Sequence, residues 1–346
     1  MLWKRVRGCA AGLFGLAVAF LSGAAPATAQ ETPTEIRVAV IPTTGPENIW
    51  DSSVTDAFAR VDAEKIHGLT VKYDMKEAAF GDKAETVMRL LAKSGRYDVI
   101  VSAGAHSDQI EKLMGDFPEV LWVSFGSGNH STGKNHYFYY GRVHQPAYLL
   151  GMLAAGMSKT GTIGAIGSFP AQDINDQINA YIAGAKSINP DTKLKVTFIE
   201  SWYDPPKATE ASYAQIAAGA DVLYELVGEV YEPCQKKQVW CLSKYKDTSS
   251  LAPDVVLSGT VLKWDPAVRE LIGAWYDFKT KGTPFAGTTE AKWFSMAEGG
   301  SDLSPYHELA KVVPDELKAK IEEAKAKIIA GDLDVPLVSD RLPEAD

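Results

Sequence analysis

The sequence predicts an α/β protein with two similar lobes, each formed around a β-sheet of parallel strands. Three observations support this prediction. Short apolar runs alternate with longer helical stretches, which is the pattern of βαβ units. The alternation begins at residue 36 and starts again at residue 146, so two lobes follow each other along the chain. The length of 346 residues suits two domains of about 100–200 residues each.

The composition is that of a globular protein and excludes several other classes. The chain is 46% hydrophobic and 23% charged, which is too apolar for a disordered chain. Its 29 glycines and 18 prolines show no period, so it is neither collagen-like nor of low complexity. The net charge is −9 and there is no basic block, so we expect no nucleic-acid partner. Three cysteines are too few for a small protein built around disulfides.

Residues 1–29 have the three parts of a secretory signal peptide. Positive side chains stand at positions 4, 5 and 7, an apolar run covers 10–21, and the segment ends in Ala27-Thr28-Ala29. The alternative is a membrane anchor, but this run is shorter than the about 20 residues that span a bilayer. We therefore expect cleavage after Ala29 and a periplasmic protein.

Two cysteines would remain after this cleavage, Cys234 and Cys241. In an oxidising compartment they can form a disulfide that closes a small loop. The alternative is a pair of buried free thiols, and the sequence leaves both open.

Residues 30–143 are assigned to the N-terminal lobe. Its first strand, 36–41, is a buried apolar run that ends at the turn 42–46, where two prolines and a glycine stand. The helix predicted at 82–93 carries Met88, Leu90 and Leu91 on its apolar side. The other elements follow the same rhythm, with strands at 69–73, 97–101, 120–125 and 137–143, and helices at 51–64 and 106–114.

Residues 144–261 are assigned to the C-terminal lobe, which opens with a buried helix at 146–158, rich in Ala, Leu and Met. Its other elements are strands at 162–166, 195–199, 222–226, 239–242 and 255–261, and helices at 173–187 and 207–218. We expect residues 262–346 to return to the N-terminal lobe and to end in a polar tail after residue 338. Helices are predicted there at 266–281 and at 315–330, the second with Glu–Lys pairs on an exposed face.

No motif in the sequence requires catalysis. A P-loop, a G-x-G-x-x-G after the first strand, a C-x-x-C, an H-E-x-x-H and a G-x-S-x-G are all absent. The six histidines lack the spacing of metal ligands, so we expect neither a metal nor a cofactor.

Candidate ligand contacts lie at the ends of predicted strands, because open parallel sheets bind ligands at the carboxyl ends of their strands. Trp50 follows the first strand, and Trp202 follows a strand of the C-terminal lobe. Each indole either packs in a core or stacks on a flat ligand ring. Gly104 and His106 follow the third strand. Glu225 ends another strand, where its carboxylate either accepts hydrogen bonds from a ligand or faces solvent.

Several short segments, in order along the chain, resemble the basic membrane protein family. The segments are 147–155 (AYLLGMLAA), 164–167 (GAIG), 181–186 (YIAGAK), 201–205 (SWYDP) and 219–222 (GADV). This family comprises substrate-binding proteins of ABC importers for purine nucleosides and related compounds. The resemblance implies a type I periplasmic-binding-protein fold, in which two Rossmann-like lobes with parallel sheets are joined by a hinge and close on the ligand.

The resemblance also implies a set of ligand contacts. The base is stacked between aromatic side chains, which Trp50 and Trp202 match, and Asp51 stands where a family motif has an asparagine. The ribose hydroxyls are held by an Asp and a Lys, which Asp247 and Lys263 match, and Gly228 falls near a glycine-containing loop of the family. The chain departs from the family at Glu47-Asn48, where the family has two aspartates, and at Lys263, which matches only with a one-residue gap. A free purine base is therefore a candidate ligand beside a purine nucleoside.

The function implied is that of a periplasmic receptor. It would deliver a purine-type small molecule to a permease and ATPase complex at the inner membrane, without being an enzyme, and we expect a monomer. Two alternatives stay open, a secreted α/β enzyme that acts on nucleosides and a two-lobed ligand sensor.

Overall fold

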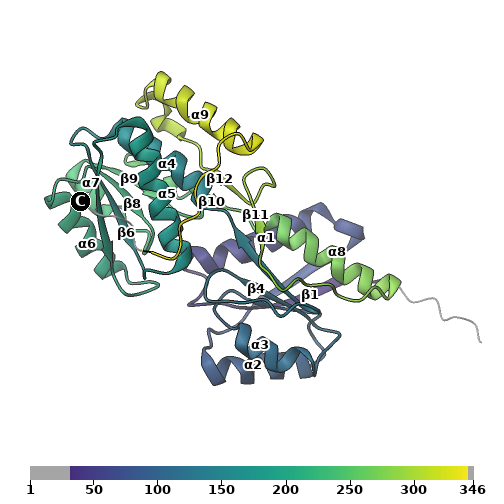
Figure 1. Cartoon of the computed structure of the whole chain (residues 1–346). Coiled ribbons are helices and arrows are strands. Elements are labelled where there is room, and N and C mark those ends of the chain that lie inside the picture. Colours follow the sequence, from purple (N-terminus) through teal and green to yellow (C-terminus); the bar gives the residue numbers. More distant parts are fainter. Residues whose placement is uncertain (1–31, 342–346) are drawn as a thin grey trace, which may run out of the picture. The chain divides into compact units, whose positions relative to one another are not determined.

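Two β-sheets of six strands each organise the chain, and the computed structural model describes residues 32–341. Each sheet and its covering helices form one lobe, which confirms the predicted α/β architecture (Figure 1). The expected signal peptide, residues 1–29, lies outside the described residues. Within residues 32–341, no helix is both long and apolar enough to cross a lipid bilayer.

The first sheet has the strand order β11-β5-β4-β3-β1-β2, and all of its strand pairs are parallel. Its strands are β1 (Glu35–Ile41), β2 (Thr70–Met75), β3 (Val99–Ser102), β4 (Leu121–Phe125), β5 (His136–Gly141) and β11 (Lys292–Phe294). Its helices are α1 (Ile49–Glu64), α2 (Gly81–Lys93), α3 (Ser107–Met114) and α8 (Asp265–Lys281).

Helices cover both faces of this sheet, so successive strand residues enter different cores. Val38 and Val40 of β1 pack with Phe58 of α1 and Trp275 of α8. Ala39, between them, belongs to the core formed with α2 and α3. Figure 1 shows α2 and α3 on one side of the sheet and α8 on the other. Burial on both faces explains why the inner strands are mostly apolar, whereas the edge strand β2 carries exposed charged residues such as Lys72 and Asp74.

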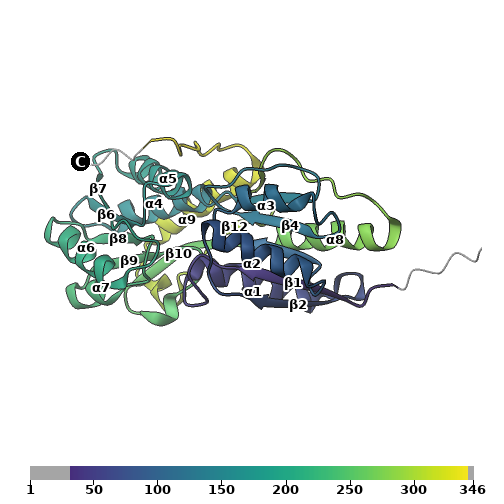
Figure 2. The ribbon, with the colours of Figure 1, turned by 90° about the horizontal axis from the view of Figure 1, so that it is seen from below.

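The second sheet has the order β12-β10-β9-β8-β6-β7, with only β12 antiparallel to its neighbour. Its strands are β6 (Thr162–Gly167), β7 (Lys193–Phe198), β8 (Val222–Glu225), β9 (Trp240–Ser243), β10 (Val256–Leu262) and β12 (Ser301–Leu303). Its helices are α4 (His144–Met157), α5 (Gln172–Ile188), α6 (Pro205–Ala217), α7 (Glu232–Lys237) and α9 (Asp315–Ala330). Figure 2 shows α4 and α5 on one side of this sheet and α6 and α7 on the other.

Two glycines allow α4 and α5 to pack closely. A Cβ atom on Gly151 of α4 would lie 1.8 Å from the carbonyl oxygen of Tyr181, and one on Gly184 of α5 would lie 1.8 Å from that of Tyr148. Any side chain at these positions would push the helices apart. Both glycines fall in the segments that carry the family resemblance, so the resemblance there reflects a packing requirement.

The chain crosses between the lobes at three places: after β5, after β10 and between β11 and β12. Hydrogen bonds join the crossings to one another. The Arg142 N–H donates to the Phe294 carbonyl at 2.9 Å, and the Lys263 N–H donates to the Gly300 carbonyl at 2.9 Å. The Ser301 hydroxyl donates to the Arg142 carbonyl at 3.0 Å. The three crossings therefore lie side by side, as the hinge of the implied fold requires.

The segment after residue 261 differs from the expectation that it returns to the N-terminal lobe. Its helix α8 and strand β11 join the first lobe, whereas β12 and α9 join the second. Leu317, Ile321, Ala324 and Ile328 form an apolar stripe at helical spacing that packs in the core with α4. The Glu–Lys pairs lie on the opposite face of α9. They predict an exposed helix and do not indicate which lobe the apolar stripe joins. The sequence also gave no signal for α7, β11 and β12, which are short.

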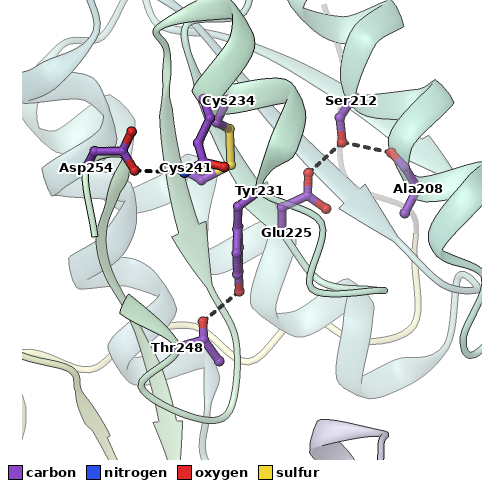
Figure 3. The surroundings of a disulfide bond; sticks show 9 residues. Ala208, Ser212, Glu225, Tyr231, Cys234, Cys241, Thr248 and Asp254 are labelled. Atoms are coloured by element: carbon purple, nitrogen blue, oxygen red, sulfur yellow. Dashed lines mark hydrogen bonds between the residues drawn. A yellow bond between two sulfur atoms is a disulfide. The ribbon is translucent and has the colours of Figure 1, made fainter. Parts of the chain in front are cut away.

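Cys234 of α7 and Cys241 of β9 are joined by a disulfide (Figure 3). Their Cα atoms are 6.1 Å apart, and both side chains are fully buried. Of the two alternatives that the sequence left open, the structure contains the bonded pair. The hydroxyl of Tyr231 at the start of this loop hydrogen-bonds with the Thr248 hydroxyl at 2.7 Å, so the loop is held at a second point.

Candidate functional site

A cavity of about 240 Å³ lies where strand ends of the two lobes face each other. The first lobe contributes residues that follow β1, β2, β3 and β4, and the second contributes residues that follow β6, β7 and β9. This is the position that parallel sheets offer to ligands. Its lining is Thr43, Asn48, Trp50, Phe80, Ala103, Gly104, Ala105, Phe125, Ser127, Ser168, Asp173, Ile174, Trp202, Lys244 and Tyr245.

Trp50 is held firmly in the wall of the cavity. It lies in the first turn of α1, where the Asn48 side chain caps the helix by accepting from the Trp50 N–H at 2.9 Å. The indole N–H donates to the Ala103 carbonyl at 2.7 Å, and the ring packs edge-on against Trp264 at 5.6 Å. Gly126, at φ +83°, leaves room for the indole, since a Cβ atom there would lie 2.5 Å from the ring. The indole is therefore fixed before any ligand arrives.

Two aromatic side chains at the cavity are much more exposed. Trp202 follows β7 and is 45% exposed, with its ring 5.0 Å from that of Phe169. Phe80 follows β2 in the other lobe and is 59% exposed. The loop that carries Trp202 ends at Asp204, whose carboxylate caps α6 by accepting from the Lys207 N–H at 3.1 Å. Exposed aromatic rings beside a cavity are suited to cover a flat apolar ligand.

Lys244, directly after β9, is a buried cation in the lining, with only 6% of its surface exposed. Its ammonium donates a hydrogen bond to the Leu226 carbonyl. Burial lowers the pKa of Lys244, and the carboxylates of Glu229, Asp173 and Glu225 oppose this shift. Within the described part of the chain, none of these carboxylates forms an ion pair with the ammonium. Lys244 is therefore a cation with donor capacity left over.

Asp173, in the first turn of α5, is the carboxylate in the lining and is 8% exposed. It accepts a hydrogen bond from the Ser127 hydroxyl of the other lobe at 2.6 Å. Burial raises the pKa of Asp173, while this hydrogen bond and the charge of Lys244 lower it. The Ser127–Asp173 bond connects the two lobes at the edge of the cavity.

The structure brings three of the expected site residues together, since Trp50, Gly104 and Trp202 all line the cavity. Two others support the lining from behind. The Asp51 carboxylate accepts from the N–H groups of Thr43, Thr44 and Gly45 at 2.8–3.1 Å, and so shapes the loop after β1.

His106 is the second residue that supports the lining. Its Nε2–H donates to the Ala79 carbonyl at 2.8 Å, directly before Phe80, and its Nδ1 hydrogen-bonds with the Ser102 hydroxyl at 2.8 Å. The ring lies under Gly104, where a Cβ atom would approach it to 2.9 Å.

The remaining four expected residues lie away from the lining. Glu225 is fully buried and accepts from the Ser212 hydroxyl at 2.6 Å (Figure 3). Asp247 pairs with His307 at 2.6 Å. Lys263 lies 3.4 Å from an oxygen of Asp302. Gly228, at φ +84°, packs beside α6. Asp247 and Lys263, which the resemblance assigns to the ribose hydroxyls, are thus engaged with other side chains.

Sequence reasoning missed Phe80, Ser127, Asp173, Lys244 and Tyr245. A signal was available for the last two, because they directly follow a predicted strand, just as Trp202 does. They stand in a stretch of charged residues, Lys244 to Asp247, which resembles a solvated loop. Asp173 starts a helix, where a carboxylate is an ordinary first-turn residue. Its exposure to the cavity depends on how the lobes face each other.

Solved solute-binding proteins of ABC transporters share this two-lobed fold. A solved solute-binding protein from Aeropyrum pernix K1 superposes with a TM-score of 0.73 at 18% identity, covering 89% of this chain and 95% of that one. One from Conexibacter woesei gives 0.68 at 20% identity, covering 87% and 98%. At these identities the likeness establishes the fold.

The family follows from the sequence as a whole. The family model described as ABC transporter substrate-binding protein PnrA-like (Bmp) matches residues 38–338, and the chain belongs to this family. A purine-binding protein of Brucella abortus (strain 2308) is 28% identical over 263 residues, which cover 75% of this chain and 71% of that protein. The nucleoside-binding protein BmpA of Lactococcus lactis subsp. cremoris is 28% identical over 214 residues, covering 56% and 58%. The match with BmpA therefore spans less than two thirds of that relative.

Membership of the family confirms the resemblance and fixes the general role. The chain is an ABC transporter substrate-binding protein. Proteins of this kind bind a small molecule outside the cytoplasmic membrane and work with a permease and an ATPase.

Proposed function

We propose that the protein binds a purine base in the interlobe cavity and delivers it to its permease and ATPase at the inner membrane. The observation that carries this proposal is the lining itself, in which five side chains are aromatic and one cation and one carboxylate stand among them. Aromatic faces bind flat rings by stacking, and a few polar groups orient them. The purine-binding and nucleoside-binding relatives support the same ligand class.

A base fits better than a nucleoside for two reasons. The volume of about 240 Å³ lies below the roughly 300–1,000 Å³ of pockets that hold drug-sized ligands. The Asp247 and Lys263 side chains, which the resemblance assigns to ribose, are paired with His307 and Asp302 instead. The cavity therefore offers a bare ring more contacts than it offers a sugar.

We also propose that the protein performs no catalysis, acts as a monomer and loses its signal peptide by cleavage after Ala29. Hydrolysis of a nucleoside would need an acid and a base at the bond that breaks. Asp173 is the one carboxylate in the lining of this cavity, and it is already bonded to Ser127. This supports binding over turnover.

Isothermal titration with hypoxanthine, guanine, adenine, inosine, adenosine and glucose tests the proposal. We expect at least one base to bind with micromolar or better affinity and to raise the melting temperature, because it binds only the folded form. Binding of glucose alone, or release of free base from inosine during incubation, would contradict it. Light scattering of the same sample measures the molar mass and so checks whether the protein is a monomer.

A further inference from the structure

Two charged side chains, Lys244 and Asp173, stand among the aromatic and uncharged polar residues that line the cavity. Both are more than nine-tenths buried, and both come from the second lobe, Lys244 after β9 and Asp173 from the first turn of α5. Buried charges need partners, because removing a charge from water is costly. The hydrogen bonds that the two side chains already form show which donors and acceptors a ligand can supply.

The Lys244 ammonium has more donors than acceptors around it. A lysine ammonium has three N–H donors and accepts nothing. The Leu226 carbonyl takes one of these donors, and the ammonium also lies over the Tyr245 ring, 5.2 Å from its centroid. The nearby carboxylates of Glu229, Asp173 and Glu225 influence its charge, but within residues 32–341 no carboxylate is close enough to pair with it. A ligand that offers a carbonyl oxygen would satisfy this cation.

The Asp173 carboxylate has more acceptor sites than donors around it. An ionised carboxylate only accepts hydrogen bonds, on two oxygens with about four lone-pair sites. The Ser127 hydroxyl occupies one oxygen at 2.6 Å. Burial raises the pKa of Asp173, and this hydrogen bond and N–H groups at the start of α5 oppose the shift. A ligand that offers an N–H would use the remaining capacity.

We propose that Lys244 and Asp173 together select 6-oxopurine bases, such as hypoxanthine and guanine, over adenine. The inference rests on the proposed purine-binding function. In a 6-oxopurine the O6 acceptor stands next to the N1–H donor, which matches an ammonium and a carboxylate that line the same cavity. Adenine carries the reverse order, with a donating amine at position 6 and an accepting N1.

In the same orientation, adenine would place its amine against the Lys244 donors and its N1 against the Asp173 acceptor. Both contacts are then repulsive, and two buried groups are left unsatisfied. Sites built to hydrogen-bond one group commonly reject an analogue that lacks it by several orders of magnitude. We expect the wild-type protein to prefer hypoxanthine to adenine by at least tenfold.

Titration of both bases into the wild type and three variants tests the inference. Lys244→Met keeps the length of the side chain but removes the donors, so it should weaken hypoxanthine binding at least tenfold and leave adenine binding unchanged or tighter. Asp173→Asn replaces an acceptor by a donor and should shift the preference toward adenine. Lys246→Met is the matched control. Lys246 pairs with Asp56 at 2.6 Å outside the lining, so its loss should leave the ratio of the two affinities unchanged.

The outcomes separate the inference from the proposed function. Tight purine binding without preference, or an equal loss of both bases in Lys244→Met, would overturn the inference and leave purine binding standing. Absence of binding by every purine would overturn both. Melting curves show whether the Lys244→Met variant is folded. If that variant is unfolded, Asp173→Asn, which keeps the shape of the side chain, tests the preference between hypoxanthine and adenine.

Discussion

Removing the indole of Trp202 tests the stacking role of the cavity with little effect on the fold. The side chain is 45% exposed, and its recorded ring contact is with Phe169 at 5.0 Å. Truncation to alanine therefore leaves no large void in a core, and the melting temperature should change little. The ligand, in contrast, would lose one of the rings that cover it.

The magnitude follows from stacking energies. Stacking of a base on an aromatic side chain contributes about 1–3 kcal/mol by alanine substitution, which corresponds to a loss of about 5- to 150-fold in affinity. Calorimetric titration of hypoxanthine into wild type and Trp202→Ala at the same pH and salt measures this loss. Trp202→Phe keeps a stacking ring and should recover most of the affinity. Leu251→Ala, a truncation at a 65% exposed position outside the lining, should have no effect.

A Trp202→Ala protein that binds hypoxanthine within twofold of the wild type would refute the stacking argument. The same conclusion would follow if Trp202→Phe were as weak as Trp202→Ala, since a ring would then contribute nothing as a ring.

Trp50→Ala should weaken purine binding at least tenfold and also lower the melting temperature by several degrees, because this indole packs on Trp264. An unchanged melting temperature in a thermal scan would contradict its structural role. Glu225 is a pH-dependent group: burial raises its pKa to about 8, so the folded protein keeps a proton that the unfolded chain releases above its usual value of 4.5. Stability should therefore fall by on the order of 3–5 kcal/mol as pH rises from about 4.5 to 8, and urea unfolding of Glu225→Gln should lack this part of the decline. Replacing Cys234 and Cys241 by serine should cost about 2.5 kcal/mol by the chain-entropy model for so short a loop, and equal urea midpoints of variant and wild type would show that the bond adds no stability.

The two-lobed fold could be predicted because its signals are local. Strands such as 36–41 are mostly apolar, since helices cover both faces of their sheet, and helical stretches alternate with them along the chain. The placement of β12 and α9 could not be predicted in this way. Their lobe depends on which core the stripe of Leu317 and Ile321 meets, and the residues of that core are distant in sequence.

Only part of the site could be predicted, namely Trp50, Gly104 and Trp202, which follow the ends of strands and line the cavity. Trp50 and Trp202 were found because a tryptophan after a strand has few other roles. Carboxylates were harder to assign, because an aspartate at a strand or helix end can hold a loop or face a ligand. The Asp51 carboxylate accepts hydrogen bonds from the backbone of its own loop, whereas Asp173 lies in the cavity wall. The two differ in tertiary surroundings that no local pattern records.

A crystal structure of the protein grown with hypoxanthine tests the central claim most directly. The account predicts density for the base between the indoles of Trp50 and Trp202, with its O6 within hydrogen-bond distance of the Lys244 ammonium. Density for the base elsewhere, such as in the groove beside Phe278 and Phe285, with the interlobe cavity free of purine at saturating concentration, would contradict it.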